Sequence, residues 1–299
     1  MSQSHLTPPA PDGDLSYSRS LPSVSSHPIT ILHSNIRGFI SHSTELLGQI
    51  ELLTTKPSFI SLNETLLDAS IEDLTLSGYT LVSRKDREDR QGGGIALFCL
   101  PEIFDTITHL EDSKFERSWH TLHSDMGPVL LGIWYRPPDN EIESILALQS
   151  ELDKHRDTHI ASIIIGDMNV HHVTWLRFSR ETQRQGAELF RIATGNGLTQ
   201  CVKDPTRYDY LLDLVLTDLE SFTSIQVLSS ISDHNSVLAS FDFRVHWEAS
   251  ISRTIWDFTK ADWEAIKSSL SAIDFTWMKD AEPDIILQFL THTILDLHE

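Results

Sequence analysis

The sequence predicts an α/β fold: a four-layer sandwich of two mixed β-sheets flanked by helices, with a short helical C-terminal tail. Short apolar runs rich in Ile, Val, Leu and Phe recur between residues 29 and 243, and such runs are typical of buried strands. Amphipathic helical patterns separate some of the runs, whereas between residues 92 and 134 several runs follow one another directly. Strands in series, combined with strands separated by helices, favour two sheets packed face to face.

The expected strands lie, in chain order, at residues 29–32, 59–62, 95–98, 129–134, 160–165, 211–216 and 236–243. Apolar side chains recur every three or four residues at 44–53, 141–152 and 182–193, which predicts three helices packed against the sheets. Gly195 and Gly197 follow the third pattern and provide a stop. Two further helical patterns, at 262–270 and 283–298, predict the tail.

The chain therefore divides into three parts. Residues 1–28 contain eight Ser and five Pro and few large apolar residues, so we expect a disordered arm that cannot offset its ordering entropy. Residues 29–243 form the sandwich domain, and residues 244–299 form a helical, linker-like tail.

Charge and composition exclude several classes of protein. The 299 residues include 23 Lys+Arg and 43 Asp+Glu, a net charge of −20, which argues against a broad basic surface that binds DNA unaided. An enzyme that gathers carboxylates around a cation remains compatible with this charge. Two cysteines cannot build a disulfide framework or a Cys-rich zinc site. The sequence contains no apolar run near 18 residues and no visible secretory signal, so we expect an intracellular protein without a membrane span.

The strongest local feature is Gly166-Asp167-Met168-Asn169, which ends a buried strand. Residues two apart in an extended chain face the same way, so Asp167 and Asn169 can act together. The carboxylate can take a proton from water or bind a hard cation, and the amide can orient the water or a phosphate oxygen. A strand-terminal Asx turn is the structural alternative.

Polar residues also stand at the ends of other predicted strands. Asn35 and Glu64 each follow one, and a carboxylate there suits magnesium. Asp233 and His234 precede the last strand, where a charged histidine can donate to a phosphate oxygen. Asp213 lies inside an apolar run and needs a partner, for which a histidine is suitable. Singly, each feature fits a surface loop or a solvated charge; their joint order favours a site.

The order Asn, Glu, Tyr, Gly-Asp-x-Asn, Asp, Ser-Asp-His resembles that of the endonuclease/exonuclease/phosphatase superfamily. The similarity is closest to the endonuclease domain of non-LTR retrotransposon polyproteins and covers roughly residues 29–243. The motifs that carry it are Asn35-Ile36-Arg37, Glu64-Thr65-Leu66-Leu67, Gly92-Gly93-Gly94, Tyr135-Arg136-Pro137-Pro138, Gly166–Asn169, Pro205-Thr206-Arg207 and Leu212–Leu216. Met168 and Leu66 depart from the usual aromatic residues without removing a catalytic atom. Residues 256–263 resemble the start of the region that precedes a reverse transcriptase in such polyproteins.

This resemblance implies metal-assisted hydrolysis of a DNA phosphodiester, with Mg²⁺ as the cofactor and Mn²⁺ as a substitute. The implied metal ligands are Asn35, Glu64 and Asp233, the implied catalytic residues are Tyr135, Asp167, Asn169, Asp213 and His234, and the implied substrate-binding residues are Arg84, Arg87, Arg136 and Thr206. Asp167 would deprotonate the attacking water, and His234, kept charged by Asp213, would stabilise the pentacovalent phosphate.

The implied partner is DNA, and the implied location is the nucleus; no protein partner is predicted. Arg84, Lys85, Arg87 and Arg90 form a basic loop that is either a DNA backbone contact or a solvated loop. An abasic-site nuclease, another phosphoesterase of the superfamily, and an inactive transposon remnant that only binds are the alternatives.

Overall fold

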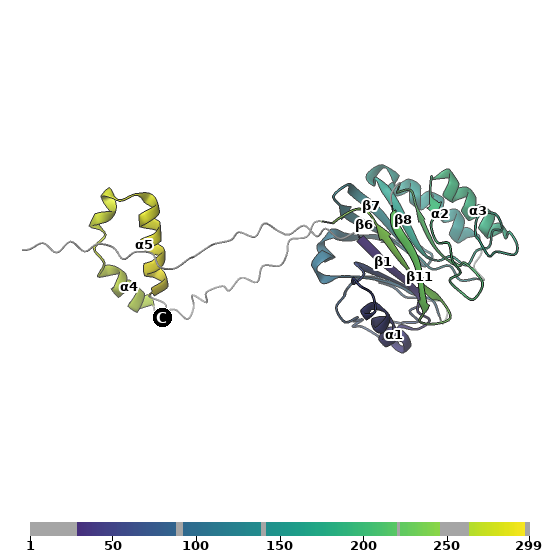
Figure 1. Ribbon diagram of the computed structural model, residues 1–299, viewed down its shortest axis with the longest axis horizontal. Coiled ribbons are helices and arrows are strands. Elements are labelled where there is room, and N and C mark those ends of the chain that lie inside the picture. The colour runs from purple at the N-terminus through teal and green to yellow at the C-terminus, as the bar shows by residue number, and fades with distance from the viewer. Residues whose placement is uncertain (1–28, 88–91, 139–141, 220–221, 246–262, 297–299) are drawn as a thin grey trace, which may run out of the picture. The chain divides into compact units, whose positions relative to one another are not determined.

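The computed structural model describes residues 29–87, 92–138, 142–219, 222–245 and 263–296. The chain divides into two compact units between residues 249 and 250. The first unit contains two six-stranded sheets packed face to face, with helices on the outer surfaces (Figure 1), so the predicted fold class is confirmed. The predicted disordered arm, Arg90, and residues 246–262 and 297–299 of the predicted tail lie outside the described residues.

The first sheet has the strand order β11-β12-β1-β2-β4-β3. Its strands are β1 (Ile29–Asn35), β2 (Phe59–Asn63), β3 (Thr80–Lys85), β4 (Ile95–Cys99), β11 (Phe222–Ser230) and β12 (Asn235–Phe241). Only β1 and β2 are parallel, joined through α1 (Phe39–Glu51). Every other neighbouring pair is antiparallel, which makes the sheet mixed.

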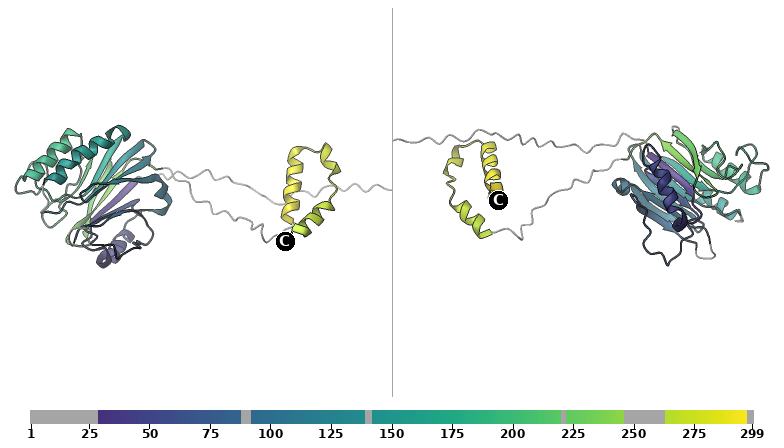
Figure 2. Two further views of the ribbon diagram at one scale, coloured as in Figure 1. Left: turned by 180° about the vertical axis from the view of Figure 1, so that it is seen from behind. Right: turned by 60° about the horizontal axis from the view of Figure 1, so that its bottom comes forward.

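The second sheet has the order β5-β6-β7-β8-β10-β9. Its strands are β5 (Ile107–Asp112), β6 (Arg117–Ser124), β7 (Gly127–Trp134), β8 (Ala161–Asp167), β9 (Thr199–Gln200) and β10 (Asp213–Thr217). The parallel pair β7 and β8 is joined through α2 (Glu143–His155), and α3 (Arg184–Gly195) follows β8. Helices α2 and α3 lie side by side on the outer face of this sheet (Figures 1 and 2). Two short 3₁₀ helices, η1 (Pro101–Thr106) and η2 (Arg156–Thr158), complete the domain.

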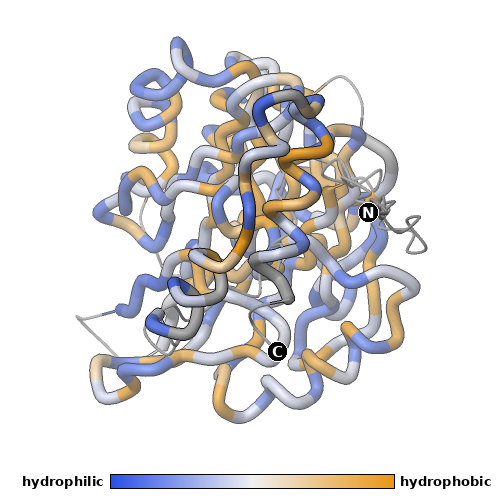
Figure 3. The backbone as a smooth tube through the Cα atoms, turned by 90° about the vertical axis from the view of Figure 1, so that its left-hand side faces the viewer, coloured by the Kyte–Doolittle hydropathy of each residue, from blue (hydrophilic) through white to orange (hydrophobic). Residues whose placement is uncertain are grey.

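Both faces of the central strands are buried, which explains their continuous apolar sequences. In β1, Ile31 joins the core between the two sheets, whereas its neighbour Leu32 joins a second core under α1. The helices alternate hydrophobic and hydrophilic residues along their length, as Figure 3 shows, because each buries only one face. The sequence did not predict β3 and β11 as separate strands. Neither has a continuous apolar run, and their described side chains are mostly half-exposed.

The strand directions bring six strand ends to one edge of the sandwich. The parallel pairs β1–β2 and β7–β8 end there, and the antiparallel strands β10 and β12 begin there. The register pairs Asn35 with Asn63 in the first sheet and Asp167 with Asp213 in the second. The polar residues noted at separate strand ends in the sequence are therefore neighbours in the fold.

The second unit contains α4 (Trp263–Ser271), η4 (Thr276–Asp280) and α5 (Pro283–Asp296). The rings of Trp277 and Phe289 meet edge to face at 5.0 Å between centroids, which joins η4 to α5. Within the residues that the structure describes, no helix combines the length and apolarity needed to cross a membrane.

A buried ion pair anchors α2 to the second sheet. The side chain of Arg117 is fully buried, and its Nε donates to Glu151 Oε2 at 2.7 Å, while Trp119 Nε1 donates to the same oxygen at 2.7 Å. The guanidinium also lies 4.5 Å from the ring centroid of Trp134. Burial by itself would raise the pKa of Glu151, but the hydrogen bond and charge of Arg117 lower it below its ordinary value.

We predict that Glu151→Gln lowers the free energy of unfolding by roughly 2–4 kcal/mol, because it leaves the Arg117 guanidinium buried without a counter-charge. Since the folded-state pKa of Glu151 is lowered, this contribution is present above the unfolded pKa and is lost as pH falls through the folded pKa. Urea unfolding at neutral and acid pH measures both effects. Glu188→Gln, which breaks a surface pair with Arg191, is the control and should cost under about 1 kcal/mol. Equal losses in both variants would contradict the anchoring role.

Candidate active site

The side chains at this edge bond to one another across the gap between the two sheets. Asn35, at the end of β1, donates from Nδ2 to Asp167 Oδ2 at 2.9 Å, at the end of β8. Asn63, at the end of β2, accepts the backbone N–H of Asp167 on its Oδ1 at 2.8 Å. The Tyr135 hydroxyl, just after β7, donates to Glu64 Oε1 at 3.0 Å. These bonds fix the carboxylates of Asp167 and Glu64 relative to each other.

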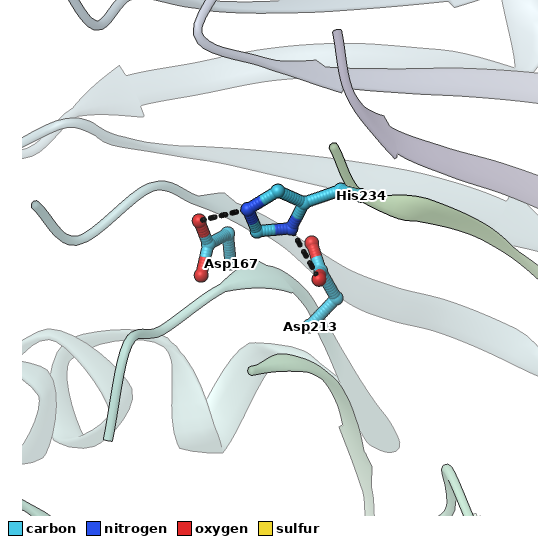
Figure 4. Close-up of side chains that lie close together, drawn as sticks. All are labelled: Asp167, Asp213 and His234. Carbon is cyan, nitrogen blue, oxygen red and sulfur yellow. Dashed lines mark hydrogen bonds and ion pairs between the residues drawn. The ribbon is translucent and has the colours of Figure 1, made fainter. Parts of the chain in front are cut away.

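His234 lies between two carboxylates, as Figure 4 shows. Its Nδ1 is 2.8 Å from Asp213 Oδ2, and its Nε2 is 3.9 Å from Asp167 Oδ2. All three side chains are buried. Each offers one atom within 4.8 Å of the others, a spacing that could also hold a metal ion. Both ring nitrogens face carboxylates, however, so the geometry fits a protonated imidazole, which cannot ligate a metal.

The pKa values of the three groups agree with that assignment. Burial lowers the pKa of His234, but the charge and hydrogen bond of Asp213 outweigh burial and raise it to about 9. Burial opposes ionisation of Asp213, yet the charge of His234 and the hydrogen bonds from both His234 and His33 hold its pKa well below the usual range. Burial, followed by the negative charge of Asp213, raises the pKa of Asp167 to about 8, against the opposing charge of His234. At neutral pH the imidazolium and the Asp213 carboxylate therefore form a buried ion pair.

A second histidine, to which the sequence analysis assigned no role, completes the coordination of Asp213. His33 Nε2 is 3.1 Å from Asp213 Oδ1, and His33 Nδ1 is 3.2 Å from Ser61 Oγ. His33 is fully buried on β1, so each oxygen of Asp213 meets a histidine from the opposite sheet. The available signal in the sequence was a histidine that continues the apolar run of residues 29–32.

Thr206, predicted to bind substrate, is fully buried. Its hydroxyl accepts the backbone N–H groups of Leu212 and Asp213 at 3.0 and 2.9 Å. These contacts place the start of β10, and with it the Asp213 carboxylate. They are the contacts of a positioning residue, and a direct substrate contact by Thr206 stays a prediction.

Two of the three predicted metal ligands offer an oxygen atom that the described part of the protein leaves without a partner, and the third, Glu64, accepts hydrogen bonds from Asn35 and Tyr135. Among the described residues, the buried atoms Asn35 Oδ1 and Asp233 Oδ1 have no hydrogen-bond partner. Arg37 lies between the carboxylates of Asp233 and Glu64, because its Nη1 is 3.0 Å from Asp233 Oδ2 and its Nε is 3.9 Å from Glu64 Oε2. A carboxamide oxygen and two carboxylates are the ligand chemistry of a hard cation such as Mg²⁺, so these residues fit the metal.

Asp233 is also held by Arg207, whose Nε and Nη2 both donate to its Oδ2 at 3.0 and 2.6 Å. Burial raises the pKa of Asp233, and the Arg207 hydrogen bond and charge more than compensate, so the pKa lies below its ordinary value. The carboxylate is therefore ionised at neutral pH with one oxygen bound to arginine and the other unpartnered.

The described residues of the predicted basic loop, Arg84, Lys85 and Arg87, make contacts within the protein. Arg84 binds both oxygens of Asp86 and the carbonyls of Asp68 and Ile71. Lys85 donates to the Ser113 carbonyl, and Arg87 pairs with Glu116 and lies over the Tyr135 ring. These contacts hold β3 and its neighbouring loop next to the site, and contact of the loop with DNA stays a prediction.

Arg136 and Asn169 hold each other. Arg136 is buried, and its Nη1 donates to the Asn169 carbonyl at 3.0 Å, while Asn169 Nδ2 donates to the Arg136 carbonyl at 2.9 Å. Asn169 also donates its backbone N–H to Asp167 Oδ1 at 3.3 Å. These contacts orient the segment that follows Asp167. Substrate binding by Arg136 and a catalytic role of Asn169 stay predictions.

Two glycines of the sequence motifs are required by close approach. A Cβ at Gly166 would lie 1.7 Å from the Trp134 carbonyl of the adjacent strand, which no side chain can tolerate. Gly94 has φ +88°, and a Cβ there would lie 2.4 Å from the Thr65 hydroxyl. Gly166 directly precedes Asp167, and Thr65 directly follows Glu64, so both close approaches lie beside residues of the site.

Backbone strain is concentrated around the same edge. Among the described residues, six that are not glycine have a left-handed backbone, namely Arg37, Glu64, Leu66, Asn169, Phe178 and Tyr208, with φ between 45° and 71°. Each such residue costs on the order of 1 kcal/mol relative to an ordinary conformation, so the surrounding structure must hold it. Arg37, Glu64 and Asn169 carry polar groups of the site described above.

Comparisons with known proteins agree with this geometry. Residues 129–238 match the protein-family model described as "Endonuclease-reverse transcriptase". A search of curated protein sequences found no match. The endonuclease domain of TRAS1, a telomere-specific non-LTR retrotransposon, has a similar solved structure, with a TM-score of 0.56 and 17% identity over 72% of this chain and 99% of that one.

Two further solved structures have the same fold. The 3′ phosphatase NExo from Neisseria, bound to a product DNA hairpin, has a TM-score of 0.57 and 15% identity over 72% of this chain and 99% of that one. An AP endonuclease from Archaeoglobus fulgidus has a TM-score of 0.54 and 16% identity over the same shares, 72% and 99%. The resemblance to the endonuclease/exonuclease/phosphatase superfamily is thereby confirmed, and at these identities the structural likeness concerns the fold.

We predict that, in protein freed of divalent metal by EDTA, the His234 ring keeps both protons at pH 7 and loses one with a midpoint near 9. Asp213→Asn should lower that midpoint by about 1–3 pH units, because it removes the neighbouring negative charge. Long-range ¹H–¹⁵N NMR of the imidazole measures both titrations. A midpoint near 6.5, the ordinary value for histidine, in both proteins would contradict the buried ion pair.

Proposed function

We propose that this domain, which has the fold of the endonuclease/exonuclease/phosphatase superfamily, is a divalent-metal-dependent endonuclease that nicks duplex DNA. The observation that carries the proposal is the buried Asp167–His234–Asp213 arrangement beside the unpartnered oxygens of Asn35 and Asp233. The folds of a retrotransposon endonuclease and of an AP endonuclease match this chain about equally well, so the fold does not decide between the two types. The family match over residues 129–238 favours an origin in a non-LTR retrotransposon. We further propose that the protein acts in the nucleus on chromosomal DNA.

Asp167 has the role of general base in this proposal. Its pKa is raised to about 8, so its ionised form, which prevails above that pH, is a stronger base than an exposed aspartate. Asn35 Nδ2 and the Asn169 backbone N–H each donate to its carboxylate, and its own backbone N–H donates to Asn63 Oδ1, which together hold the residue in one orientation. It accepts a proton from the water that attacks the phosphorus.

His234 has the role of electrostatic stabiliser. The charge of Asp213 keeps its imidazole protonated, so that Nε2–H can donate to an oxygen of the pentacovalent phosphate. Burial, followed by the charge of Glu64, raises the pKa of Tyr135, so its hydroxyl also remains protonated and able to donate to a phosphate oxygen. Both donors are fixed before substrate binds, which lowers the reorganisation needed in the transition state.

Asn35, Glu64 and Asp233 are the residues that would hold the cation. When bound, Mg²⁺ supplies polarisation of a phosphoryl oxygen and neutralises charge on the leaving 3′ oxygen. Arg37 and Arg207 balance the same carboxylates in the protein alone.

We predict that the protein converts supercoiled plasmid to open circles with Mg²⁺ or Mn²⁺ and does not do so with EDTA, because the carboxylate and carboxamide oxygens suit a hard cation. Glu64→Gln should reduce the rate by on the order of 10²-fold or more. Glu188→Gln, a change of a half-buried residue on α3 that pairs with Arg191 at the surface, is the matched control and should leave the rate unchanged. Folded protein that nicks neither plasmid nor oligonucleotide duplexes under any divalent ion would favour an inert remnant, and nicking confined to abasic DNA would favour a repair nuclease.

We predict that His234→Ala lowers single-turnover nicking by about 10²–10⁴-fold while DNA affinity changes little, because the imidazolium acts mainly on the transition state. Asp213→Asn should produce a smaller loss, and the double variant should be little worse than His234→Ala, because two groups that act as a unit are not additive. Rates at saturating protein, with thermal melting as the fold control, give all four values. Fully multiplicative losses would refute the pairing, and wild-type rates in His234→Ala would refute the site.

A further inference from the structure

Three of the six residues with left-handed backbone have no role in the chemistry above. Leu66, Phe178 and Tyr208 have φ of 53°, 71° and 49°, and they are apolar or aromatic and exposed by 47%, 44% and 74%. The core does not explain them, because their side chains extend into solvent. An exposed apolar side chain in a strained backbone is a candidate for contact with a ligand.

Leu66 lies beside the metal ligands. It follows Glu64 by two residues, and its backbone N–H donates to the Gly93 carbonyl at 2.9 Å. The preceding N–H, of Thr65, donates to Gly94 at 3.3 Å. The glycine segment therefore holds the backbone of Leu66 in place while leaving its side chain outside.

Tyr208 lies in a tight turn that is bonded to the site. Arg207 and Tyr210 exchange two backbone hydrogen bonds, of 3.0 and 2.8 Å, which fix Tyr208 at the tip of the turn. The guanidinium of Arg207 lies 5.8 Å from the Tyr208 ring centroid while it binds the Asp233 carboxylate. The Tyr208 ring therefore lies next to Arg207, which directly contacts the predicted metal ligand Asp233.

Phe178 lies on the segment that follows Asn169, and this segment contacts the same turn. The rings of His171 and Tyr210 meet edge to face at 5.2 Å, and Arg180 lies 5.5 Å from the Tyr210 ring. Arg177 lies 5.7 Å from the Phe178 ring itself. Packing among His172, Trp175 and Phe190 anchors the segment below.

We propose that Leu66, Phe178 and Tyr208 form a base-contact rim around the site, and that the preferred substrate is DNA with unpaired bases beside the cleaved phosphate. The proposal rests on the proposed nuclease function. Aromatic rings stack on any unpaired base, and an aliphatic side chain can hold base steps apart. Arg177 lies beside the Phe178 ring, and Arg180 lies beside the Tyr210 ring of the turn that carries Tyr208, so both place positive charge near these stacking surfaces in a protein whose net charge is −20. Arg207 lies beside the Tyr208 ring, but its charge is paired with Asp233. Fully paired DNA conceals the base faces that this rim would contact.

The test measures binding of the full chain, in EDTA, to two fluorescein-labelled duplexes of the same length, one fully paired and one with a central two-base mismatch bubble. Wild-type protein should bind the bubble about tenfold more tightly or better. Tyr208→Ala and Phe178→Ala should each lose on the order of tenfold of affinity for the bubble and little for the paired duplex. Tyr208→Phe, which keeps the ring, should retain the preference.

Phe104→Ala is the matched control, because Phe104 is also exposed but lies in η1, after the end of β4 that is remote from Glu64. It should bind both duplexes as wild type does. Equal affinity of wild-type protein for the two duplexes, or a preference that persists when all three rim residues are alanine, would overturn the rim. Nicking with Mg²⁺ is scored separately. Protein that prefers the bubble but never nicks supports the rim and refutes the nuclease, whereas protein that nicks without any preference refutes only the rim.

Discussion

The arrangement of the site depends on one buried carboxylate. Asp213 belongs to the second sheet, yet its two oxygens bind His33, on β1 of the first sheet, and His234, which directly precedes β12 of that sheet. An ionised carboxylate in this environment is tolerated only when its oxygens are paired, so the two histidines make its burial possible. The same bonds fix how the two sheets meet at this edge. The geometry of the candidate site and the packing of the sandwich at this edge are therefore set by the same interaction.

The other bonds between the sheets extend this arrangement. Asn35 and Asn63 reach across to Asp167, and Tyr135 reaches across to Glu64. Asp167 and Glu64 are thus each held from the opposite sheet, while the apolar faces behind them are buried. A rigid core with polar bonds at one edge explains how strained residues such as Glu64 and Asn169 can persist.

Much of this structure could be predicted from the sequence, and there are physical reasons why the remainder could not. Buried central strands such as β2 and β8 have continuous apolar sequences, whereas β3 at a sheet edge has half-exposed side chains and no such signal. Asp213 could be recognised because a carboxylate in an apolar run needs a partner. Its second partner, His33, could not, because the pairing spans 180 residues and depends on the packing of two sheets. The arginines Arg84 and Arg87 look equally available for DNA in the sequence. Arg84 pairs with Asp86, its near neighbour along the chain, whereas Arg87 pairs with Glu116, which comes close to it only in the fold.

The net negative charge of the protein affects how this site could bind DNA, which is itself a polyanion. Several positive groups near the edge neutralise carboxylates within the protein, as Arg37 and Arg207 do for Asp233. Long-range attraction of DNA by the whole surface is therefore weak, and recognition must rely on short-range contacts. A cation held by Asn35, Glu64 and Asp233 would add positive charge where the phosphate binds, and apolar contacts such as those of Tyr208 do not depend on net charge. A site built in this way obtains affinity at the reacting phosphate and its neighbouring bases, and less from the backbone of distant DNA.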